Sequence, residues 1–529
     1  MISRNPQSVK VIYKLCVLSF LLACFFSLHF LATINKLPCE KKCNIILISI
    51  DSLGSNYVGT YNENIIESPT PSIDSWAEKS IVFEDYITPS YLTPITEMSL
   101  HTSLSPLNSG VVRFDSVLNN KFITLAQVLQ SSGYYTVAMG SSPEFFDFSY
   151  ALRESFSRGF DEYYKEFQVP PIESRTYFRS GRALSNNPLS WIKNPPDDKF
   201  FLWLTLGTAH WPYGRYPFSY QQEYNGPLKD ENKLDWWDHL RTIYEGNIWS
   251  LDELGTTITP LTDEDSRYIK EGYLSNIRAT DEFLGKFFKA FKRSVIAENT
   301  IVILHSEHGE EMGEHGYYAH YDIYDATIHT PLIIYIPGEK PQRIDSLVNS
   351  FDVLPTILDY IQEPPLNQAE GISLRPLIEK STSSIRNETF SVRVPLWEHA
   401  IQTSNGFIQN EESVYQKIQD SLTSFDELDK KDAIFDVAIR TKEWKLIWRK
   451  ARLQEAQYGW WNLITQRDTI RDLYELYNLK EDPNELRNVY NKEEEVAKEL
   501  KNKLDIWWEK TQQTRNSEPV IEGTIQPYF

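Results

Sequence analysis

The sequence predicts an α/β protein with a mostly parallel sheet sandwiched by helices, plus a smaller C-terminal antiparallel sheet with a helix. Two observations predict the larger part: near-continuous apolar runs of strand length, and helical patterns that lie between them. Unbroken apolar runs are typical of strands buried on both faces, and alternation of strand with helix is typical of parallel sheets. Beyond about residue 380 this alternation gives way to patterns typical of antiparallel strands with turns, which predicts the smaller part.

The expected strands of the larger sheet are apolar runs at 44–51, 81–88, 134–140, 200–207, 300–306 and 331–338. Between them, helical patterns fall at 71–80, 123–133 and 275–294. In sheets of this kind, ligands bind beyond the carboxyl ends of the strands. Polar residues at those ends are therefore the first candidates for a functional site.

Several polar residues stand at these strand ends. Asp51 ends the first run, His210 follows the run at 200–207, and Glu307 and His308 follow the run at 300–306. These residues come from distant parts of the chain, which a local role such as helix capping does not explain. We expect them to converge on one edge of the sheet.

Beyond residue 380, the segments 436–453 and 471–486 are typical of antiparallel strands joined by turns, and 491–511 is an amphipathic helical pattern. The predicted organisation is a membrane anchor at 1–35, a stem at 36–43, a catalytic domain at 44–380 and a smaller subdomain at 381–529. An acidic insert at 214–272 is either a lid or irregular packing.

Composition and charge narrow the classes of function. The chain has 529 residues, 41% of them hydrophobic, and a formal net charge of −20. That charge argues against a nucleic-acid partner, because phosphate binding needs a basic face. All four Cys lie within the first 43 residues, so the folded part has no cysteine nucleophile, disulfide framework or thiolate metal site.

The N-terminal region contains a 20-residue run, 15–34, without a charged residue. A run of that length can cross a bilayer once. Arg4, Lys10 and Lys14 precede it, as in a signal-anchor. The expectation is a single-pass membrane protein with its catalytic domain exported to the periplasm or the extracellular side. A cleaved signal peptide is the alternative.

Six motifs then occur in the order expected of the sulfatase family, which the chain resembles from about residue 44 to about residue 510. They are "NIILISIDSLGSNYVGTYN", "SPTPSIDSWAEKSIVFEDYITPS", "LGTAHWPYG", "ILHSEHGEEMGEHGYYAHYDIYDATIHTPLIIYIPG", "SFDVLPTILDYI" and "DLYELYNLKEDPNELRNVY". The resemblance implies an alkaline-phosphatase-like fold. It is less specific for the reaction, because that superfamily cleaves sulfate esters, phosphate mono- and diesters and phosphonates, and also transfers phospho-groups.

The resemblance places the nucleophile between "YITPS" and residues 109–111. An ungapped match puts Thr93 there, whereas a match anchored on Pro94 would put Leu92 there, which has no nucleophilic atom. Thr93 is therefore the predicted nucleophile. Sulfatases carry a Cys or Ser that is oxidised to formylglycine, and Thr cannot yield that aldehyde.

The chain departs from the sulfatase pattern at further positions. Glu97 replaces the Arg that follows the nucleophile, Ser52 replaces the second Asp of the metal pair, and "GSSP" at 140–143 replaces the pocket Lys and His. These departures make the pattern more similar to the Thr-dependent branch, with lipoteichoic acid synthases and phosphoethanolamine transferases.

That branch holds one metal with a carboxylate, the nucleophilic Thr, a second carboxylate and a His. The matching set here is Asp51, Thr93, Glu307 and His308, with Glu307 in place of the usual Asp. A His ligand favours Mn²⁺ or Zn²⁺ over the Ca²⁺ of sulfatases. Coordination lowers the pKa of a Thr hydroxyl, which is otherwise a poor nucleophile.

Three further histidines are candidates for substrate binding or for protonating the leaving group: His210, His315 and His320. For His315 and His320, surface or supporting roles remain open. The predicted function is a metal-dependent hydrolase or transferase that acts on phosphate esters or diesters of an envelope lipid or glycan. The alternatives are sulfate-ester hydrolysis without formylglycine, and an inactive relative that binds a headgroup or partner.

Overall fold

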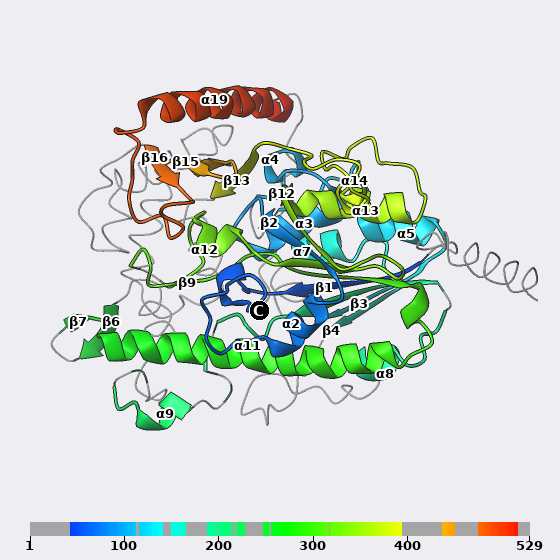
Figure 1. The fold of residues 1–529 in the computed structure, drawn as a ribbon, viewed down its shortest axis with the longest axis horizontal. Helices are drawn as coiled ribbons and strands as arrows, with labels where there is room; N and C mark the ends of the chain where they lie inside the picture. The colour runs from blue at the N-terminus through cyan, green and yellow to red at the C-terminus, as the bar shows by residue number, and fades with distance from the viewer. Residues whose placement is uncertain are drawn as a thin grey trace, which may run out of the picture.

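A computed structural model describes residues 43–112, 116–140, 150–165, 188–228, 247–393, 436–449 and 474–516, apart from positions 198, 212, 215, 217, 218, 227, 253, 254 and 317. Within this part the chain forms one large sheet, one smaller sheet and helices packed on both (Figure 1).

The larger sheet has eight described strands, and its central strand is β1. Their order is β12 (Gln342–Asn349), β2 (Ile81–Ile87), β11 (Leu332–Tyr335), β8 (Thr300–Ser306), β1 (Asn44–Ile50), β5 (Phe200–Leu206), β3 (Tyr135–Gly140) and β4 (Glu162–Lys165). β1 pairs in parallel with both β5 and β8, and β11 is antiparallel to both of its neighbours. The carboxyl ends of β1, β5 and β8 therefore share one edge.

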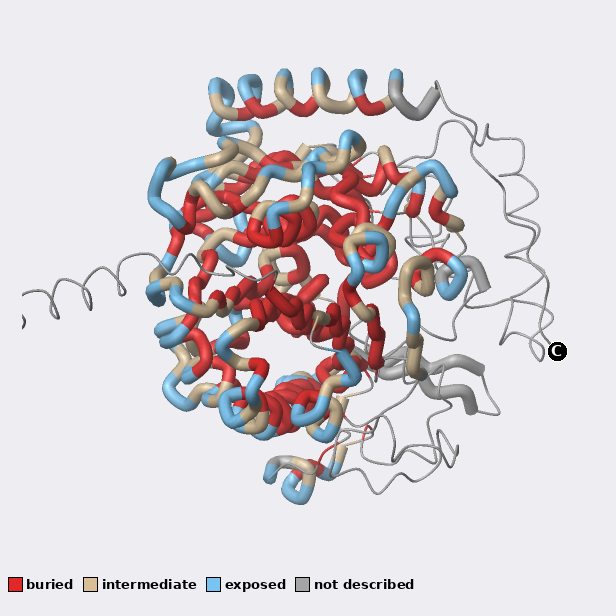
Figure 2. The backbone as a smooth tube through the Cα atoms, turned by 90° about the vertical axis from the view of Figure 1, so that its right-hand side faces the viewer, coloured by how far each residue is buried: buried red, intermediate tan, exposed pale blue. Residues whose placement is uncertain are grey.

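Helices cover both faces of this sheet (Figure 1). One face carries α2 (Pro71–Ala77) and α11 (Asp263–Lys292), and the other carries α3 (Thr93–Thr102), α5 (Leu125–Ser131), α13 (Val353–Tyr360) and α14 (Arg375–Ile378). Side chains of β1 alternate between the two cores: Ile46 and Ile48 join the first, and Ile45 and Leu47 the second. The apolar run predicted as a strand buried on both faces thus contributes side chains to both cores. Figure 2 shows the buried residues gathered in the interior of the described part of the chain.

The longest described helix, α11, begins earlier than its apolar pattern predicted. Thr262 and Asp265 form a capping box, in which each side chain accepts a hydrogen bond from the other residue's backbone N–H. Asp263 and Glu264 add negative charge at the positive end of the helix dipole, and Lys289 and Lys292 add positive charge at the other end. The cap, and not the apolar stripe, sets the start of this helix.

The smaller sheet is antiparallel, with the order β13 (Thr389–Arg393), β14 (Asp436–Arg440), β15 (Trp444–Trp448) and β16 (Tyr474–Asn478). Helix α19 (Glu494–Asn516) packs on it through Leu500 and Leu504, and α4 (Pro106–Ser109) adds Leu107 to the same core. The predicted fold class is confirmed: a mostly parallel sheet sandwiched by helices, and a second antiparallel sheet with a helix.

The remaining described elements are η1 (Ser55–Tyr57), α7 (Tyr150–Phe156), α8 (Pro188–Trp191), α9 (Ser219–Glu223), β6 (Asn247–Asp252), β7 (Gly255–Pro260), η3 (Ala297–Asn299), β9 (Glu311–Met312), β10 (Tyr318–Ala319), α12 (Asp325–Ile328) and η4 (Ser350–Asp352). Of these, α9 and the β6–β7 hairpin fall in the segment 214–272 that was predicted as an insert.

The predicted membrane location is corrected. No helix in the described ranges combines the length and the apolar character that crossing a bilayer requires, and the predicted anchor at 15–34 lies outside those ranges. The two longest described helices, α11 and α19, are amphipathic and carry many charged residues. A run of 20 uncharged residues meets the length requirement for crossing a bilayer, but length alone does not establish a spanning helix.

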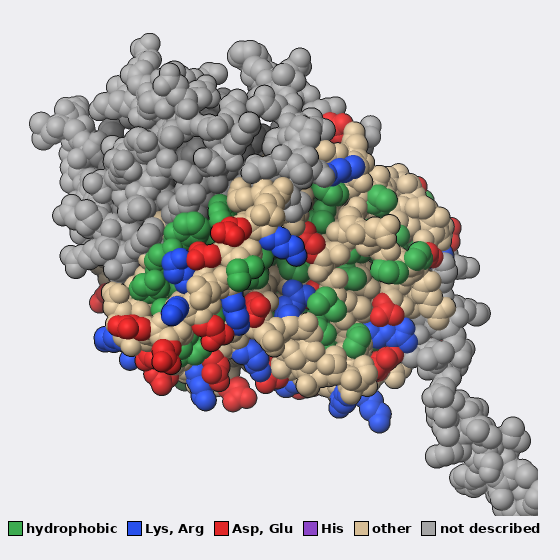
Figure 3. Space-filling view, turned by 90° about the horizontal axis from the view of Figure 1, so that it is seen from above, with side chains coloured by type: hydrophobic (Ala, Val, Ile, Leu, Met, Phe, Trp, Pro, Cys, Tyr) green, Lys and Arg blue, Asp and Glu red, His purple; other side chains and the backbone are tan. Residues whose placement is uncertain are grey.

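Figure 3 shows one face of the molecule, on which Lys and Arg side chains are interspersed with Asp and Glu. The described part of that face therefore shows no continuous basic patch.

Candidate catalytic and metal site

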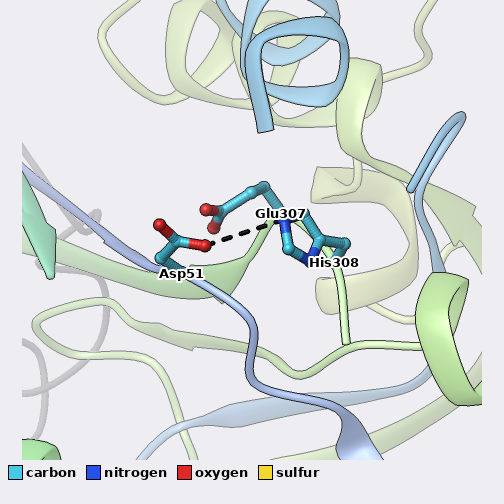
Figure 4. A group of neighbouring side chains, drawn as sticks. All are labelled: Asp51, Glu307 and His308. Atoms are coloured by element: carbon cyan, nitrogen blue, oxygen red, sulfur yellow. Dashed lines mark ion pairs between the residues drawn. The ribbon is translucent and has the colours of Figure 1, made fainter. Parts of the chain in front are cut away.

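Three predicted ligands meet at the carboxyl edge of the larger sheet (Figure 4). Asp51 follows β1, and Glu307 and His308 follow β8, its parallel neighbour. The register pairs Ile50 with Ser306, so the two chain segments leave the sheet side by side. One ligand atom from each of Asp51, Glu307 and His308 lies within 4.8 Å of the others, and all three side chains are buried.

Thr93 joins this group from a different element. It is the first residue of α3, and Pro94 follows it in the first helical turn, where a missing N–H costs no hydrogen bond. The Thr93 Oγ1 lies 2.9 Å from Nε2 of His308, 215 positions away in the sequence. Leu92, the residue of the alternative alignment, packs instead in a hydrophobic core.

The hydrogen bonds of His308 define its tautomer. Its Nδ1 lies 3.0 Å from the carbonyl oxygen of Gly309, which can only accept, so Nδ1 carries the proton. Nε2 then offers a lone pair toward Thr93 and lies 3.6 Å from Oδ1 of Asp51. Burial, together with the neighbouring His320, lowers the pKa of His308 to about 3, so the ring is neutral at pH 7.

The pKa values of the two carboxyl groups shift in opposite directions. Burial raises the pKa of Glu307 well above its ordinary value, and the charges of Asp51 and Glu97 raise it further. Burial opposes ionisation of Asp51 too, but His210, His308 and His320 leave the pKa of Asp51 below its ordinary value. Among the described residues, no donor reaches either buried carboxylate oxygen of Glu307 with hydrogen-bonding geometry.

These features suit a divalent cation. Two carboxylates, a neutral imidazole nitrogen and a hydroxyl oxygen converge, and a positive ion would offset the burial and the repulsion that raise the Glu307 pKa. The orphaned oxygens of Glu307 are the clearest sign, because buried carboxylates are normally paired or bound to metal. Although Glu307 is one methylene longer than Asp, its carboxylate still lies within 4.8 Å of the ligand atoms of Asp51 and His308.

His210 and His320 lie beside this group. The ring centroid of His320 is 4.1 Å from that of His308 and 5.2 Å from that of His210. Glu310 orients His320, because a carboxylate oxygen of Glu310 accepts a hydrogen bond of 3.1 Å from Nδ1 of His320. The Tyr213 hydroxyl donates to the other oxygen of Glu310 over 2.8 Å. Burial raises the pKa of Glu310 to about 7. Sequence reasoning missed Glu310 and Tyr213, although Glu310 lies within the quoted "SEHGEE".

Ser52, where the family pattern has a second Asp, supports the site through its backbone and its hydroxyl. It adopts a left-handed conformation with φ of 64°, which costs a non-glycine residue about 1 kcal/mol. Its hydroxyl donates to Oδ1 of Asp51 over 3.1 Å, and the Tyr273 hydroxyl donates to its carbonyl oxygen over 2.6 Å. Of the "GSSP" segment, 141–143 lies outside the described residues.

His315, the third predicted pocket histidine, has hydrogen-bond partners outside the group of Asp51, Thr93, Glu307 and His308. Its Nδ1 lies 3.1 Å from Glu311, and its Nε2 lies 3.1 Å from the carbonyl oxygen of Glu485. Its ring stacks on Tyr324 with centroids 3.6 Å apart. Glu485 also pairs with Lys445 of β15, so His315 connects the loop after β8 to the smaller sheet.

We expect His315 to stabilise the protein in a pH-dependent way. Burial opposes its positive charge, but the hydrogen bond and charge of Glu311 raise its pKa above the ordinary value. A raised histidine pKa gives stability that is fully present below the unfolded-state pKa and lost as pH rises through the folded-state pKa. His315→Gln should therefore lower the free energy of unfolding by about 1–2 kcal/mol at pH 6 and by less at pH 9.

Urea unfolding of both proteins at the two pH values measures this difference. An equal loss at pH 6 and pH 9 would show that His315 acts through packing on Tyr324 and not through its charge.

Comparison with known proteins agrees with this architecture. The family model described as Sulfatase matches residues 43–363, more than half of the chain. The chain is 23% identical to an arylsulfatase of Clostridium perfringens over 393 residues, which covers 65% of this chain and 80% of that protein. It is 22% identical to an ulvan-active sulfatase of Formosa agariphila over 418 residues, covering 73% of this chain and 77% of that one.

A phosphonate monoester hydrolase of Agrobacterium radiobacter has a similar fold, with a TM-score of 0.59 and 18% identity over 90% of this chain and 96% of that one. The motifs, the fold and the ligand group at the strand ends all agree with the family match. The chain belongs to the sulfatase family.

Proposed function

We propose that this chain is a metal-dependent hydrolase or transferase that cleaves phosphate esters or diesters with Thr93 as its nucleophile. One observation carries the proposal: the Thr93 hydroxyl lies 2.9 Å from Nε2 of His308, inside a group that also contains the carboxylates of Asp51 and Glu307. A hydroxyl beside such a group is the arrangement that activates an alcohol for attack.

The nature of the nucleophile supports phosphate over sulfate. Every Cys precedes residue 44, so no cysteine can stand at the position of Thr93 and be oxidised to an aldehyde. A threonine hydroxyl instead forms a direct ester with the transferred group. The sequence motifs led to the same expectation, because Thr93 stands where the family places its nucleophile.

The residues that would hold the ion are Asp51, Glu307, His308 and Thr93. The ion, when bound, would supply positive charge that lowers the pKa of the Thr93 hydroxyl and stabilises negative charge on the reacting oxygens. The imidazole ligand favours Mn²⁺ or Zn²⁺ over Ca²⁺.

In the proposed reaction, Thr93 Oγ1 releases its proton to solvent water and forms a bond to the substrate phosphorus. The bond from phosphorus to the leaving oxygen breaks, and that oxygen takes up a proton. His320, whose ring lies beside His308, and His210, whose ring lies beside His320, are the candidates to donate it. Water or an acceptor alcohol then attacks the phosphorus of the Thr93 ester. This second step releases the product and restores the Thr93 hydroxyl.

A second candidate is sulfate-ester hydrolysis without formylglycine. The family match favours it, as do the similarities to an arylsulfatase and an ulvan-active sulfatase. The second of those relatives is named for its activity on ulvan, and a related ester is a candidate substrate for this chain as well.

A panel of esters distinguishes these functions. The full chain, stripped with EDTA and reloaded with Mn²⁺, Zn²⁺ or Ca²⁺, is assayed with bis-p-nitrophenyl phosphate, p-nitrophenyl phosphate and p-nitrophenyl sulfate. We expect Mn²⁺- or Zn²⁺-dependent release of nitrophenol from a phosphate ester. Cleavage of the sulfate alone would support the second candidate. No cleavage and no bound ion would indicate a relative that only binds its ligand.

A further inference from the structure

Two arginines of the smaller sheet, Arg393 and Arg449, are completely buried, which is rare for arginine unless the side chain is paired. Arg393 is the last residue of β13, and Arg449 directly follows β15. Both pair with Asp436, the first residue of β14: Nη1 of Arg393 lies 3.1 Å, and Nη1 of Arg449 3.7 Å, from its Oδ2. The reaction proposed above uses none of these three residues.

Both arginines also contact the chain segment that follows β10. Nε of Arg393 donates a hydrogen bond of 2.7 Å to the carbonyl oxygen of Tyr321. Nη1 of Arg449 pairs with the carboxylate of Asp322, the next residue, which is itself completely buried. Two consecutive residues of this segment are therefore each held by an arginine of the smaller sheet.

The segment held in this way directly follows His320. The His320 side chain is 9% exposed, and its ring centroid lies 4.1 Å from that of His308. Ala319, just before it, has a left-handed backbone with φ of 67°. A residue with a Cβ keeps that conformation only where surrounding contacts hold it. The backbone is therefore constrained on both sides of His320: by this turn before it and by the two arginines after it.

A guanidinium group suits this task, because its planar set of N–H donors binds two acceptors in fixed directions. Arg393 thereby joins the Tyr321 carbonyl oxygen to Asp436. Arg449 is fixed in turn by Glu475, which accepts from its Nε over 2.9 Å and from its Nη2 over 2.6 Å. Replacing buried ion pairs by apolar side chains often leaves stability unchanged, so net stability alone does not account for these arginines.

We propose that Arg393 is a positioning residue for the active site: together with Arg449, it fixes the segment 320–322 so that His320 lies against His308. The inference rests on the proposed function, in which His320 is a candidate to protonate the leaving oxygen. It goes beyond that function because it makes the smaller sheet part of the catalytic machinery, although none of the four proposed ion ligands comes from that sheet.

The test is the kcat of Arg393→Lys with Mn²⁺ and diphenyl phosphate, or phenyl phosphate if the wild type cleaves only monoesters. Phenol is a poorer leaving group than nitrophenol, so its release depends more on protonation. Lysine keeps the positive charge near Asp436, but one ammonium group cannot reproduce the two bonds that the guanidinium makes in fixed directions. We expect kcat to fall about 10- to 100-fold, the loss typical of a catalytic group that is misplaced.

A double-mutant comparison shows whether Arg393 acts through His320. In the His320→Gln background, Arg393→Lys should lower kcat by no more than about 3-fold further, because the group that Arg393 positions is already absent. Unchanged kcat in Arg393→Lys alone would overturn the proposal, and so would equal losses with and without His320.

Arg440→Lys is the matched control. Arg440 is another buried arginine of the smaller sheet, but it pairs with Asp85 of β2 and with Asp325 of α12 and not with the segment 320–322. The control should lower the urea midpoint of unfolding, as Arg393→Lys does, and leave kcat within about 3-fold. An equal loss of kcat in Arg440→Lys would overturn the role of Arg393, because attachment of the sheet as a whole would then explain the effect.

A spectroscopic measurement does not depend on activity. The full chain is labelled with ¹³C at histidine Cε1, and His320→Gln assigns the His320 signal at pH 7.5. Arg393→Lys should move that signal and leave the signal of His101, which packs on Trp203, in place. A His320 signal that does not move would overturn the proposal.

Asp322→Asn tests the same positioning if Arg393→Lys does not fold. It weakens the pair with Arg449 and keeps the shape of the side chain, so it should lower kcat and move the His320 signal in the same way. If Asp322→Asn changes neither property, the arginines do not position His320 and the proposal is overturned.

The outcomes separate this proposal from the proposed function. If the wild type cleaves no phosphate ester but Arg393→Lys moves the His320 signal, the proposed function fails and the positioning by the smaller sheet stands. If the wild type cleaves a phosphate ester and Arg393→Lys changes neither kcat nor the signal, only the positioning role is overturned.

Discussion

Replacing Thr93 with Ala is expected to lower kcat for cation-dependent phosphate-ester cleavage by at least about 1,000-fold, the loss typical of removing a nucleophile that acts with its activating group. The reason is geometric, because the Thr93 Oγ1 is the hydroxyl that lies 2.9 Å from Nε2 of His308. The ligands Asp51, Glu307 and His308 stay in place, so the variant should still bind the cation. Steady-state assays with bis-p-nitrophenyl phosphate and calorimetry with Mn²⁺ measure the two properties separately.

Two variants make this result specific. Thr93→Ser keeps a hydroxyl at the same position and should retain much of the activity. Thr102→Ala removes another buried hydroxyl from α3, one that donates to the carbonyl oxygen of Met98, and should leave kcat within about 3-fold. Full activity in Thr93→Ala would show that the nucleophile lies elsewhere and that the alignment register is wrong.

Replacing Glu307 with Gln should weaken cation binding by at least about 100-fold, because it removes one of two charged ligands. The same change should make the cation-free protein more stable, by about 1–2 kcal/mol at pH 8. The cause is that Glu307 is completely buried beside Asp51 and no described donor reaches its oxygens. A neutral amide removes that repulsion.

The sign of the stability change is the informative part. Without the ion, an increase in the midpoint of urea unfolding is expected for Glu307→Gln relative to the wild type. With saturating Mn²⁺ the order should reverse, since only the wild type gains stability from binding. A loss of stability in both conditions would mean that Glu307 is a structural residue with partners of its own.

The fold explains why these residues meet. β1 and β8 are adjacent and parallel, so the residues that follow Ile50 and Ser306 leave the sheet at the same edge. α3 begins beside them with Thr93. Side chains from three chain segments therefore converge beyond the carboxyl ends of the strands, where ligands bind in sheets of this kind.

Much of this was predictable from local sequence. Five of the six apolar runs became strands within one residue of the expected ends, because a strand buried on both faces needs an unbroken apolar stretch. The run expected at 331–338 forms a strand only over Leu332–Tyr335. Asp51, Glu307 and His308 were identified because they follow such runs. The start of α11 was not predicted, since a capping box outside the apolar stripe determines it.

Other features depend on which elements pack together. His315 and His320 are five positions apart in one segment, yet His320 lies against His308, while His315 contacts Glu485 near the smaller sheet. Nothing in their local sequence distinguishes them, because the segment after β8 contacts both sheets. The roles of Glu310 and Tyr213 follow from the same folding of that segment.

The sequence by itself determined the fold class, the family and the ligand types at the strand ends, because strand periodicity and short motifs are local properties. Only the tertiary structure decided that the Thr93 Oγ1 lies 2.9 Å from Nε2 of His308, and that His320 rather than His315 lies against the His308 ring. Contacts between a helix face and a strand depend on how the two pack, and side-chain order along the chain does not encode that packing directly.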